Sequence, residues 1–270
     1  MLRNNKYAII NNDDKYKEYF LLKENNNITY SFTKGDYYIK DYQITSSHST
    51  FKVINKNKEY TFTTKLLGKH NIYNSLASII VLNKIGYSFE EINNVLTIVS
   101  GPKGRMENIS YNNNNIIIDY AHTPDGIANV LKTAKELKPN QIITIMGCGG
   151  GTGSDREKRS TMGKLVLELS NKTIFTNDNP RDEEPNQIIN DLLKEKTNNN
   201  YIIELDRKKA IEQGIKMLTN NDILLILGKG HENYQTIGNK KTHFSDKETV
   251  EEIIKANRCV SYLFEIFLIF

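Results

Sequence analysis

Strand-like and helix-like segments alternate through the second half of the sequence. Ile116–Asp119, Gln141–Met146 and Thr173–Thr176 are apolar runs, and each is followed by residues at helical spacing. Tyr201–Leu205 and Asp222–Leu227 continue the same order. Because this alternation builds βαβ units, it predicts an α/β fold with a mostly parallel sheet. In such sheets ligands bind outside the carboxyl ends of the strands, so a site is expected in the loops that follow them.

The first hundred residues have a different pattern. Between residues 7 and 64, short runs alternate apolar and polar side chains and are separated by Asn, Asp, Gly and Ser, which indicates antiparallel strands. From Ile72 the spacing becomes helical, and a second helix is expected over Phe89–Ile98. The Gly-Pro-Lys-Gly segment at 101–104 then predicts a domain boundary. We therefore expect domains at residues 1–102 and 103–258, followed by an apolar tail at 259–270.

The two ends of the sequence and its cysteines indicate where in the cell the protein is located. A last helix is expected over Asp246–Asn257, and the tail beyond it contains Glu265 and is shorter than the ~20 residues that a helix needs to cross a bilayer. We interpret the tail as a foreign or frayed end, with a membrane-surface or partner-docking segment as the alternative. The N-terminus has no apolar core of a secretion signal, and Cys148 and Cys259 lack the spacing of a disulfide framework or zinc site. These features favour a cytoplasmic protein.

Composition narrows the classes of partner. The chain is 38% hydrophobic and 25% charged, which is typical of a soluble globular protein. Its 36 basic and 32 acidic residues leave a net charge of +4, without the clustered basic stripe of a nucleic-acid binder. We therefore expect an anionic small molecule as ligand, and neither nucleic acid nor membrane.

The glycine-rich loop after the second predicted strand does not fit the common nucleotide motifs. Gly147, Gly149 and Gly153 do not form G-x-G-x-x-G, because Thr152 stands at the last glycine position. Every Gly-Lys pair in the chain is followed by a residue other than Ser or Thr, so no Walker A motif is present. The sequence argues against a nicotinamide-cofactor site and against a local triphosphate cradle.

Two other loops carry groups suited to an amino acid. Arg156 and Arg181 could each bind a carboxylate with a planar guanidinium, although surface ion pairs would explain them as well. Asp178 and Asn179, beside the rigid Pro180, could accept hydrogen bonds from an ammonium group. Glu232, which follows a predicted strand end and the glycines Gly228 and Gly230, could pair with a second ammonium, or could simply be a carboxylate at the start of a helix.

Three further polar residues allow a nucleotide or a structural role. Asn71 and Asn74 lie three residues apart near a predicted helix start, so both amides could face one adenine ring. In a chain rich in Asn, helix capping is the better explanation of the two residues from the sequence alone. His122 could bind a phosphate, but capping the helix that begins at Pro124 fits its spacing better.

The motifs taken together resemble the Mur ligase family. The resemblance extends from Tyr7 to Arg258, and its specificity lies in the combination and order of the motifs, which are Gly68-Lys-His-Asn-Ile-Tyr-Asn74, Gly104-Arg-Met-Glu107, Asp119-Tyr-Ala-His-Thr-Pro-Asp125, Asp178-Asn-Pro-Arg-Asp-Glu-Glu-Pro185 and Gly228-Lys-Gly-His-Glu232. It implies part of a central ATPase domain followed by a Rossmann-like C-terminal domain. It also implies an ATP- and Mg²⁺-dependent peptide ligase of peptidoglycan precursor synthesis, which acts through an acyl phosphate on a UDP-N-acetylmuramoyl-dipeptide.

The resemblance also implies roles for single residues. Arg181 matches the members that add diaminopimelate, whose second carboxylate needs a cation, and not those that add lysine. Its implied amino-acid site comprises Arg156, Asp178, Asn179, Pro180, Arg181, Gly228 and Glu232. Its implied ATP site comprises Asn71, Asn74, Arg105, Asp119 and His122.

The sequence also departs from the family pattern. The loop at 153–159 is shorter than the family's glycine-aspartate-arginine-aspartate version, which weakens the assignment of Arg156. The P-loop, the metal ligands and the uridine-sugar domain have no counterpart in the sequence. We therefore expect a C-terminal portion of a ligase that is inactive alone, exposes apolar surface and depends on a missing half. The rival hypotheses are a non-catalytic amino-acid-binding fragment, a lysine-adding or folylpolyglutamate-type ligase, and a dinucleotide oxidoreductase.

Overall fold

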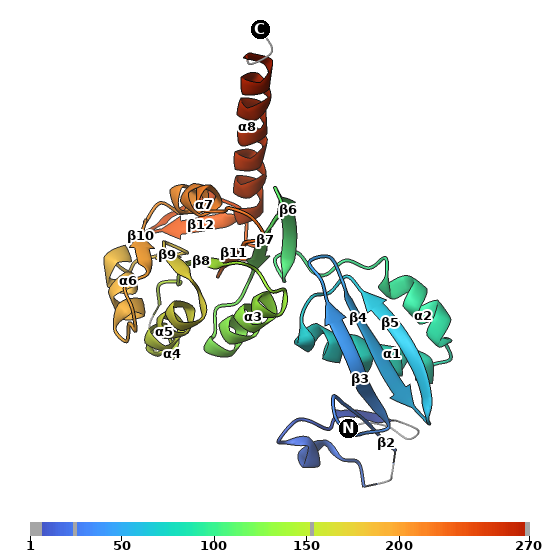
Figure 1. The fold of residues 1–270 in the computed structure, drawn as a ribbon. Helices are drawn as coiled ribbons and strands as arrows, with labels where there is room; N and C mark the ends of the chain where they lie inside the picture. The colour runs from blue at the N-terminus through green and yellow to red at the C-terminus, as the bar shows by residue number, and fades with distance from the viewer. Residues whose placement is uncertain (1–6, 24–25, 152–153, 268–270) are drawn as a thin grey trace. The chain divides into compact units, whose positions relative to one another are not determined.

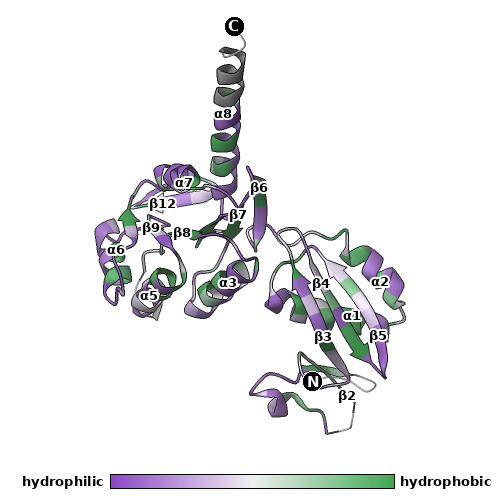
Figure 2. Cartoon of the chain, in the orientation of Figure 1, coloured by the Kyte–Doolittle hydropathy of each residue, from purple (hydrophilic) through white to green (hydrophobic). Residues whose placement is uncertain are grey.

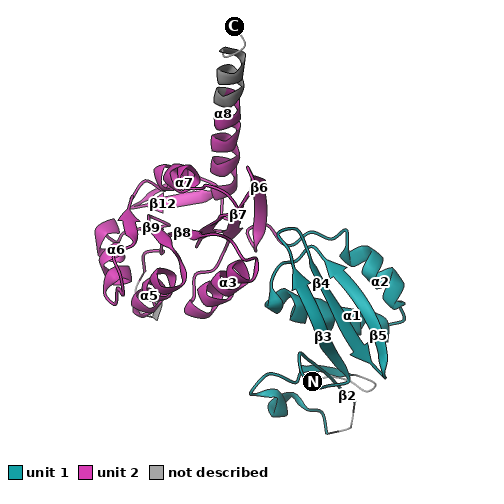
Figure 3. Cartoon of the chain, in the orientation of Figure 1, with its two compact units in different colours: residues 1–101 teal, residues 102–270 magenta. Residues whose placement is uncertain are grey.

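The computed structural model describes residues 7–23, 26–151 and 154–267, and these fall into two compact units (Figures 1 and 3). The first unit covers residues 1–101 and the second residues 102–270. Each unit has its own sheet and its own apolar core.

The sheet of the first unit has the order β1-β2-β3-β4-β5. Its strands are β1 (Ala8–Asn11), β2 (Asn27–Ser31), β3 (Tyr37–Ile44), β4 (Ser49–Asn55) and β5 (Lys58–Thr64). The pairs β3–β4 and β4–β5 are antiparallel, as predicted. The pairs β1–β2 and β2–β3 are parallel, so the prediction of antiparallel strands is wrong for this part.

Two helices complete the first unit after the short 3-10 helix η1 (Lys17–Phe20). Along α1 (Lys69–Lys84), Ile72, Leu76 and Ile79 recur at helical spacing and are fully buried in a core with aromatic side chains of β4 and β5. The following helix, α2 (Phe89–Leu96), begins with a capping box in which Ser88 and Glu91 satisfy each other's backbone N–H groups. Both helices lie where the spacing predicts them.

The sheet of the second unit has the order β10-β9-β8-β11-β7-β6. All neighbouring pairs are parallel except β6–β7, which confirms the predicted α/β fold with a mostly parallel sheet. Its strands are β6 (Glu107–Tyr111), β7 (Asn114–Asp119), β8 (Ile142–Met146), β9 (Lys172–Phe175), β10 (Tyr201–Ile203) and β11 (Ile223–Leu227). A separate antiparallel hairpin consists of β12 (Tyr234–Ile237) and β13 (Lys240–His243).

The central strands are buried on both faces, which explains their continuous apolar runs. Every residue of β8 and β11 is buried, and the green colour of β7 and β8 in Figure 2 marks the hydrophobic residues of the central strands. The helices of this unit are α3 (Pro124–Glu136), α4 (Ser154–Glu157), α5 (Arg159–Leu169), α6 (Pro185–Leu193), α7 (Arg207–Lys216) and α8 (Asp246–Phe267).

The last helix is longer than predicted. It continues to Phe267 instead of ending near Asn257, and it therefore includes most of the segment that we interpreted as a frayed tail. Tail residues 268–270, and all side chains from Val260 onward, lie outside the described residues. Within the part of the chain that the structure describes, no helix is both long and apolar enough to cross a membrane.

Candidate functional site

The predicted site loops of the second unit meet at one edge of its sheet. The strands β7, β8, β9 and β11 are parallel neighbours, so the loops that follow them start side by side. Two close approaches depend on glycine: a Cβ atom on Gly147 would lie 2.6 Å from the carbonyl oxygen of Thr176, and one on Gly150 would lie 1.8 Å from that of Pro180. The glycine loop and the 177–184 loop are thus packed backbone against backbone.

The 178–181 loop is fixed by the hairpin strand β12. The Arg181 N–H donates to the carbonyl of Thr236 (3.1 Å), and the Arg181 carbonyl accepts from the N–H of Gly238 (2.7 Å). The N–H of Thr236 donates to Asn179 Oδ1 (2.9 Å). Sequence reasoning missed this contact, since the alternating pattern of residues 234–237 and the Gly-Asn turn predict a hairpin but not its partner.

Arg181 is one of the two arginines predicted to bind a carboxylate. Its backbone φ is +52°, in the left-handed region. One nitrogen, Nη1, donates to the carbonyl of Gly150 (2.7 Å), and the residue is exposed. Within the described residues Arg181 forms no ion pair, so the alternative of a surface ion pair is wrong for this residue.

Arg156 shares a pocket with Arg181. The pocket has a volume of about 580 Å³, and its other lining residues are Gly150, Gly151, Asp182, Glu183, Glu184 and Gln187. Arg156 donates from Nε to Asp191 Oδ2 (3.0 Å), so for this residue the ion-pair alternative is correct. Half of its side chain is still exposed, which leaves the guanidinium accessible from the pocket.

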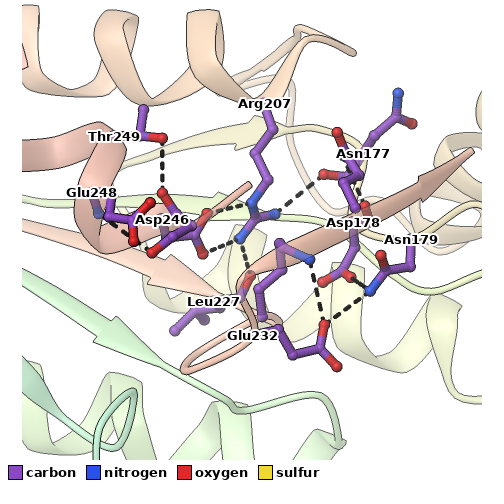
Figure 4. A network of polar contacts seen from close by, with 12 residues as sticks. Asn177, Asp178, Asn179, Arg207, Leu227, Glu232, Asp246, Glu248 and Thr249 are labelled. Carbon is purple, nitrogen blue, oxygen red and sulfur yellow. Dashed lines mark hydrogen bonds and ion pairs between the residues drawn. The ribbon is translucent and has the colours of Figure 1, made fainter. Parts of the chain in front are cut away.

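The residues predicted to bind an ammonium group belong to a buried polar network (Figure 4). Asn179 donates from Nδ2 to Asp178 Oδ1 (3.0 Å) and to Glu232 Oε2 (2.9 Å). Arg207 forms a fully buried, two-bonded ion pair with Asp246, at 2.7 and 2.8 Å. Burial raises the pKa of Asp178, and the nearby Arg207 only partly opposes this rise. The structure therefore brings the predicted ammonium-binding residues together in one connected network.

Gly228 is required by this network. Its φ is +111°, a conformation that only glycine adopts readily, and a Cβ atom there would lie 2.5 Å from Asp178 Oδ2. Glu232 does not start a helix, as the alternative interpretation supposed. It closes a tight turn in which its N–H donates to the carbonyl of Lys229 (2.9 Å).

A second cluster surrounds the ring of Tyr120, beyond the end of β7. The Arg105 guanidinium lies 5.0 Å from the ring centre, and the rings of His122 and His231 lie at 4.7 and 5.2 Å. The backbones approach closely here, since a Cβ on Gly104 would lie 2.1 Å from the backbone nitrogen of His231. The arrangement places one cation and two imidazoles where an anionic group could bind.

The remaining predicted ATP-site residues have structural contacts. The Asp119 carboxylate accepts from the N–H groups of Met106 (2.7 Å) and Ala121 (2.8 Å), and so ties β7 to the segment before β6. Asn71, in the first unit, donates to the carbonyl of Leu67 (2.8 Å) and accepts from Asn74 (3.3 Å).

The capping interpretations are wrong. The N-cap of α1 is Gly68, without a side-chain cap, so neither Asn71 nor Asn74 caps that helix. Thr123 caps α3 by accepting from the N–H of Gly126, and His122 instead lies 2.8 Å from the Tyr120 carbonyl through Nδ1. An exposed imidazole next to Thr123 is therefore available for another role.

Arg159 is an important residue that sequence reasoning missed. It is fully buried, and it binds both carboxylate oxygens of Glu183 at 2.7 Å, an oxygen of Asp191 and the Gly149 carbonyl. This contact lowers the pKa of Glu183 to about 2. The Arg159 guanidinium thus holds Glu183, which lines the pocket shared by Arg156 and Arg181.

Comparisons with known proteins agree with the fold and the motifs. The model of the Mur ligase glutamate ligase domain matches residues 104–230, and that of the Mur ligase middle domain matches residues 1–82. The chain belongs to the Mur ligase family. This assignment confirms the resemblance of the motifs and removes the dinucleotide oxidoreductase from the rival hypotheses.

Curated relatives indicate the subfamily. The chain is 38% identical over 260 residues to UDP-N-acetylmuramoyl-L-alanyl-D-glutamate–2,6-diaminopimelate ligase 1 of Clostridium acetobutylicum, covering 94% of this Mur ligase chain and 54% of that protein. It is 42% identical to the ligase of the same name from Aquifex aeolicus, covering 94% and 52%. The chain spans about half the length of the curated relatives that it matches.

Solved structures of ligases are also similar to this chain. A structure of UDP-N-acetylmuramoyl-L-alanyl-D-glutamate–2,6-diaminopimelate ligase superposes with a TM-score of 0.70 at 33% identity, covering 94% of this chain and 54% of that one. A folylpolyglutamate synthase from Mycobacterium tuberculosis superposes with a TM-score of 0.60 at 12% identity over 75% of this chain, which indicates a shared fold only.

Proposed function

We propose that this chain provides the amino-acid-binding part of an ATP-dependent ligase that joins meso-diaminopimelate to UDP-N-acetylmuramoyl-L-alanyl-D-glutamate. In the proposed reaction ATP phosphorylates the substrate carboxylate, and an amine of diaminopimelate attacks the acyl phosphate. The names of the relatives support this proposal, as does the order of the motifs. A cytoplasmic location and a role in peptidoglycan synthesis follow from the same proposal.

The observation that carries the proposal is the pairing of a cation site and an anion site within one loop. Arg181 presents a guanidinium without an ionic partner among the described residues, and Asn179, two positions earlier, is bonded to the Glu232 carboxylate. Diaminopimelate carries carboxylates and ammonium groups at both ends of a short chain. Lysine lacks the second carboxylate and would leave the Arg181 fork without a charged partner.

Calorimetric titration of the purified chain tests the proposal. We expect meso-diaminopimelate to bind more tightly than lysine, and Arg181→Ala to weaken diaminopimelate binding about tenfold while leaving lysine binding nearly unchanged. Arg258→Ala removes an exposed arginine on α8 and serves as the matched control. Equal losses for the two amino acids in Arg181→Ala would contradict the proposed role, and preferential binding of lysine would favour the lysine-adding alternative.

The Tyr120 cluster is the proposed phosphate end of an ATP site. Within the second unit, Arg105, Asp119 and His122 would face the ribose or the phosphates, as the family resemblance implies. No group of three or more His, Cys, Asp or Glu side chains placed to hold a metal occurs among the described residues. We therefore derive no step through the metal.

A non-catalytic amino-acid-binding protein is the second candidate. It is favoured by the lack of a Gly-Lys-Ser or Gly-Lys-Thr motif in the sequence, because the proposed phosphoryl transfer needs a triphosphate cradle. The two candidates share the amino-acid site and differ in turnover. In the ligase proposal, the cradle and the sugar-nucleotide site lie in the part of the relatives that this sequence does not cover.

A further inference from the structure

Lys229 is a charged residue that the proposed function has not used. It follows β11 in the Gly-Lys-Gly-His-Glu segment, and its side chain is fully buried. A lysine ammonium group is costly to remove from water unless it is paired. Lys229 is paired with Glu232, and we relate its burial to this contact.

The Lys229 ammonium group contacts one carboxylate oxygen of Glu232 and one backbone carbonyl. Its Nζ donates to the carbonyl of Tyr234 and lies 3.4 Å from Glu232 Oε2. The same oxygen accepts from Asn179 Nδ2 at 2.9 Å. The other oxygen, Oε1, is contacted by the Tyr234 hydroxyl at 3.3 Å. Two buried residues thus contact Oε2, while the side chain of Glu232 remains 17% exposed.

The buried network holds more carboxylates than cations. It contains the carboxylates of Asp178, Glu232 and Asp246 and the cations of Lys229 and Arg207. Arg207 forms its two-bonded ion pair with Asp246, whereas the ion pair of Lys229 is with Glu232. A bound ammonium group would add a third cation next to these carboxylates.

We propose that Lys229 is a positioning residue, which anchors Oε2 of Glu232 so that Oε1 faces the ammonium group of the incoming amino acid. This inference rests on the proposed function and adds to it the residue that orients its anion site. Lys229 itself does not contact the ligand in this arrangement. Its removal should therefore affect recognition of the amine and leave recognition of the carboxylates intact.

The test compares meso-diaminopimelate with pimelate, which has the two terminal carboxylates but no amines. Calorimetry should show that Lys229→Met weakens diaminopimelate binding about tenfold and leaves pimelate binding unchanged. Lys229→Gln keeps a donor for the Tyr234 carbonyl but has no charge. It should have the same effect on binding as Lys229→Met, and it replaces Lys229→Met if the methionine variant does not fold. Lys208→Met, at an exposed lysine paired with Glu252, is the matched control and should bind both ligands normally.

A double-mutant cycle separates positioning from a general loss of stability. If Lys229 acts through Glu232, adding Lys229→Gln to Glu232→Gln should cause no further loss of diaminopimelate binding. Additive losses would overturn the proposal, as would equal losses for the two ligands or normal diaminopimelate binding by a folded Lys229 variant.

A measurement without ligand distinguishes failure of this inference from failure of the proposed function. The side-chain amide of Asn179 bonds to Glu232, so its nitrogen-15 NMR signals should shift in Lys229→Gln but not in Lys208→Met. If the unmodified chain does not bind diaminopimelate, the proposed function fails, and a shifted Asn179 signal would still support the positioning role. Unshifted signals in Lys229→Gln would overturn it.

Discussion

At the residue scale, Gly228 gives a direct test of how tightly the network is packed. Gly228→Ala should destabilise the chain by roughly 1–3 kcal/mol more than Gly238→Ala, because overpacking adds to backbone strain. Both glycines have positive φ, but a Cβ on Gly228 would meet Asp178 Oδ2, whereas one on Gly238 would meet nothing within 4 Å. Urea denaturation of the two variants measures the difference, and equal midpoints would show that Asp178 moves aside at little cost.

Single residues differ in how far the sequence identifies them. Arg181 and Glu232 were predictable as candidate ligand groups, because each lies in a loop that follows a recognisable strand. Arg159 and Lys229 were not, since a buried cation looks like any surface cation in the sequence. The burial of Arg159 depends on Glu183, a partner from a distant segment, and such long-range pairing leaves no local signal. Lys229 is bonded to the nearby Tyr234 carbonyl, but the turn that brings the two together is set by tertiary contacts.

At the scale of elements, the contact between Arg159 of α5 and Glu183, which lies just before α6, predicts a pH dependence. The pKa of Glu183 is lowered from 4.5 to about 2 in the folded chain. A lowered pKa stabilises the fold above the unfolded value, and this stabilisation is lost as the pH falls from about 4.5 toward 2. Acid titrations of the unfolding free energy should therefore show a shallower decline in Glu183→Gln than in the unmodified chain.

Other groups titrate in the same range, so a comparison is needed. Glu212→Gln is the control, because Glu212 has a lowered pKa from an exposed pair with Lys216 on α7 and contacts neither α5 nor α6 in that pair. Exposed helical pairs contribute little to stability, so its profile should resemble that of the unmodified chain. A Glu183→Gln profile as steep as the control would contradict a bracing role for the Arg159 contact.

The types of the elements were more predictable than their pairing. Periodicity located α1, α2 and the strands of the parallel sheet, because amphipathic spacing reflects which side chains face a core. It did not reveal that β1 and β2 run parallel or that β12 pairs with the 178–181 loop. Strand direction and partner are set by the path of the connecting chain and by tertiary contacts, which a local pattern does not contain.

At the scale of the whole molecule, binding and turnover should be separable. We expect the purified chain to bind diaminopimelate but to release no ADP when given ATP, Mg²⁺, diaminopimelate and the UDP-sugar dipeptide. Stabilising the charge of a transferring phosphoryl group needs a cradle of donors and a metal ion. The sequence has no Walker A motif, and the described residues contain no cluster of acidic or histidine ligands for a metal.

A coupled assay of ADP release measures this prediction, with the full-length ligase of Clostridium acetobutylicum as the positive control. Turnover by the chain alone would contradict it and would require that phosphate-binding groups other than a Walker A motif act here, with the Tyr120 cluster as the first place to look. Arg105→Ala would then abolish that turnover if the cluster binds the phosphates. Binding without turnover would agree with the prediction and would leave amino-acid binding as the activity of this chain.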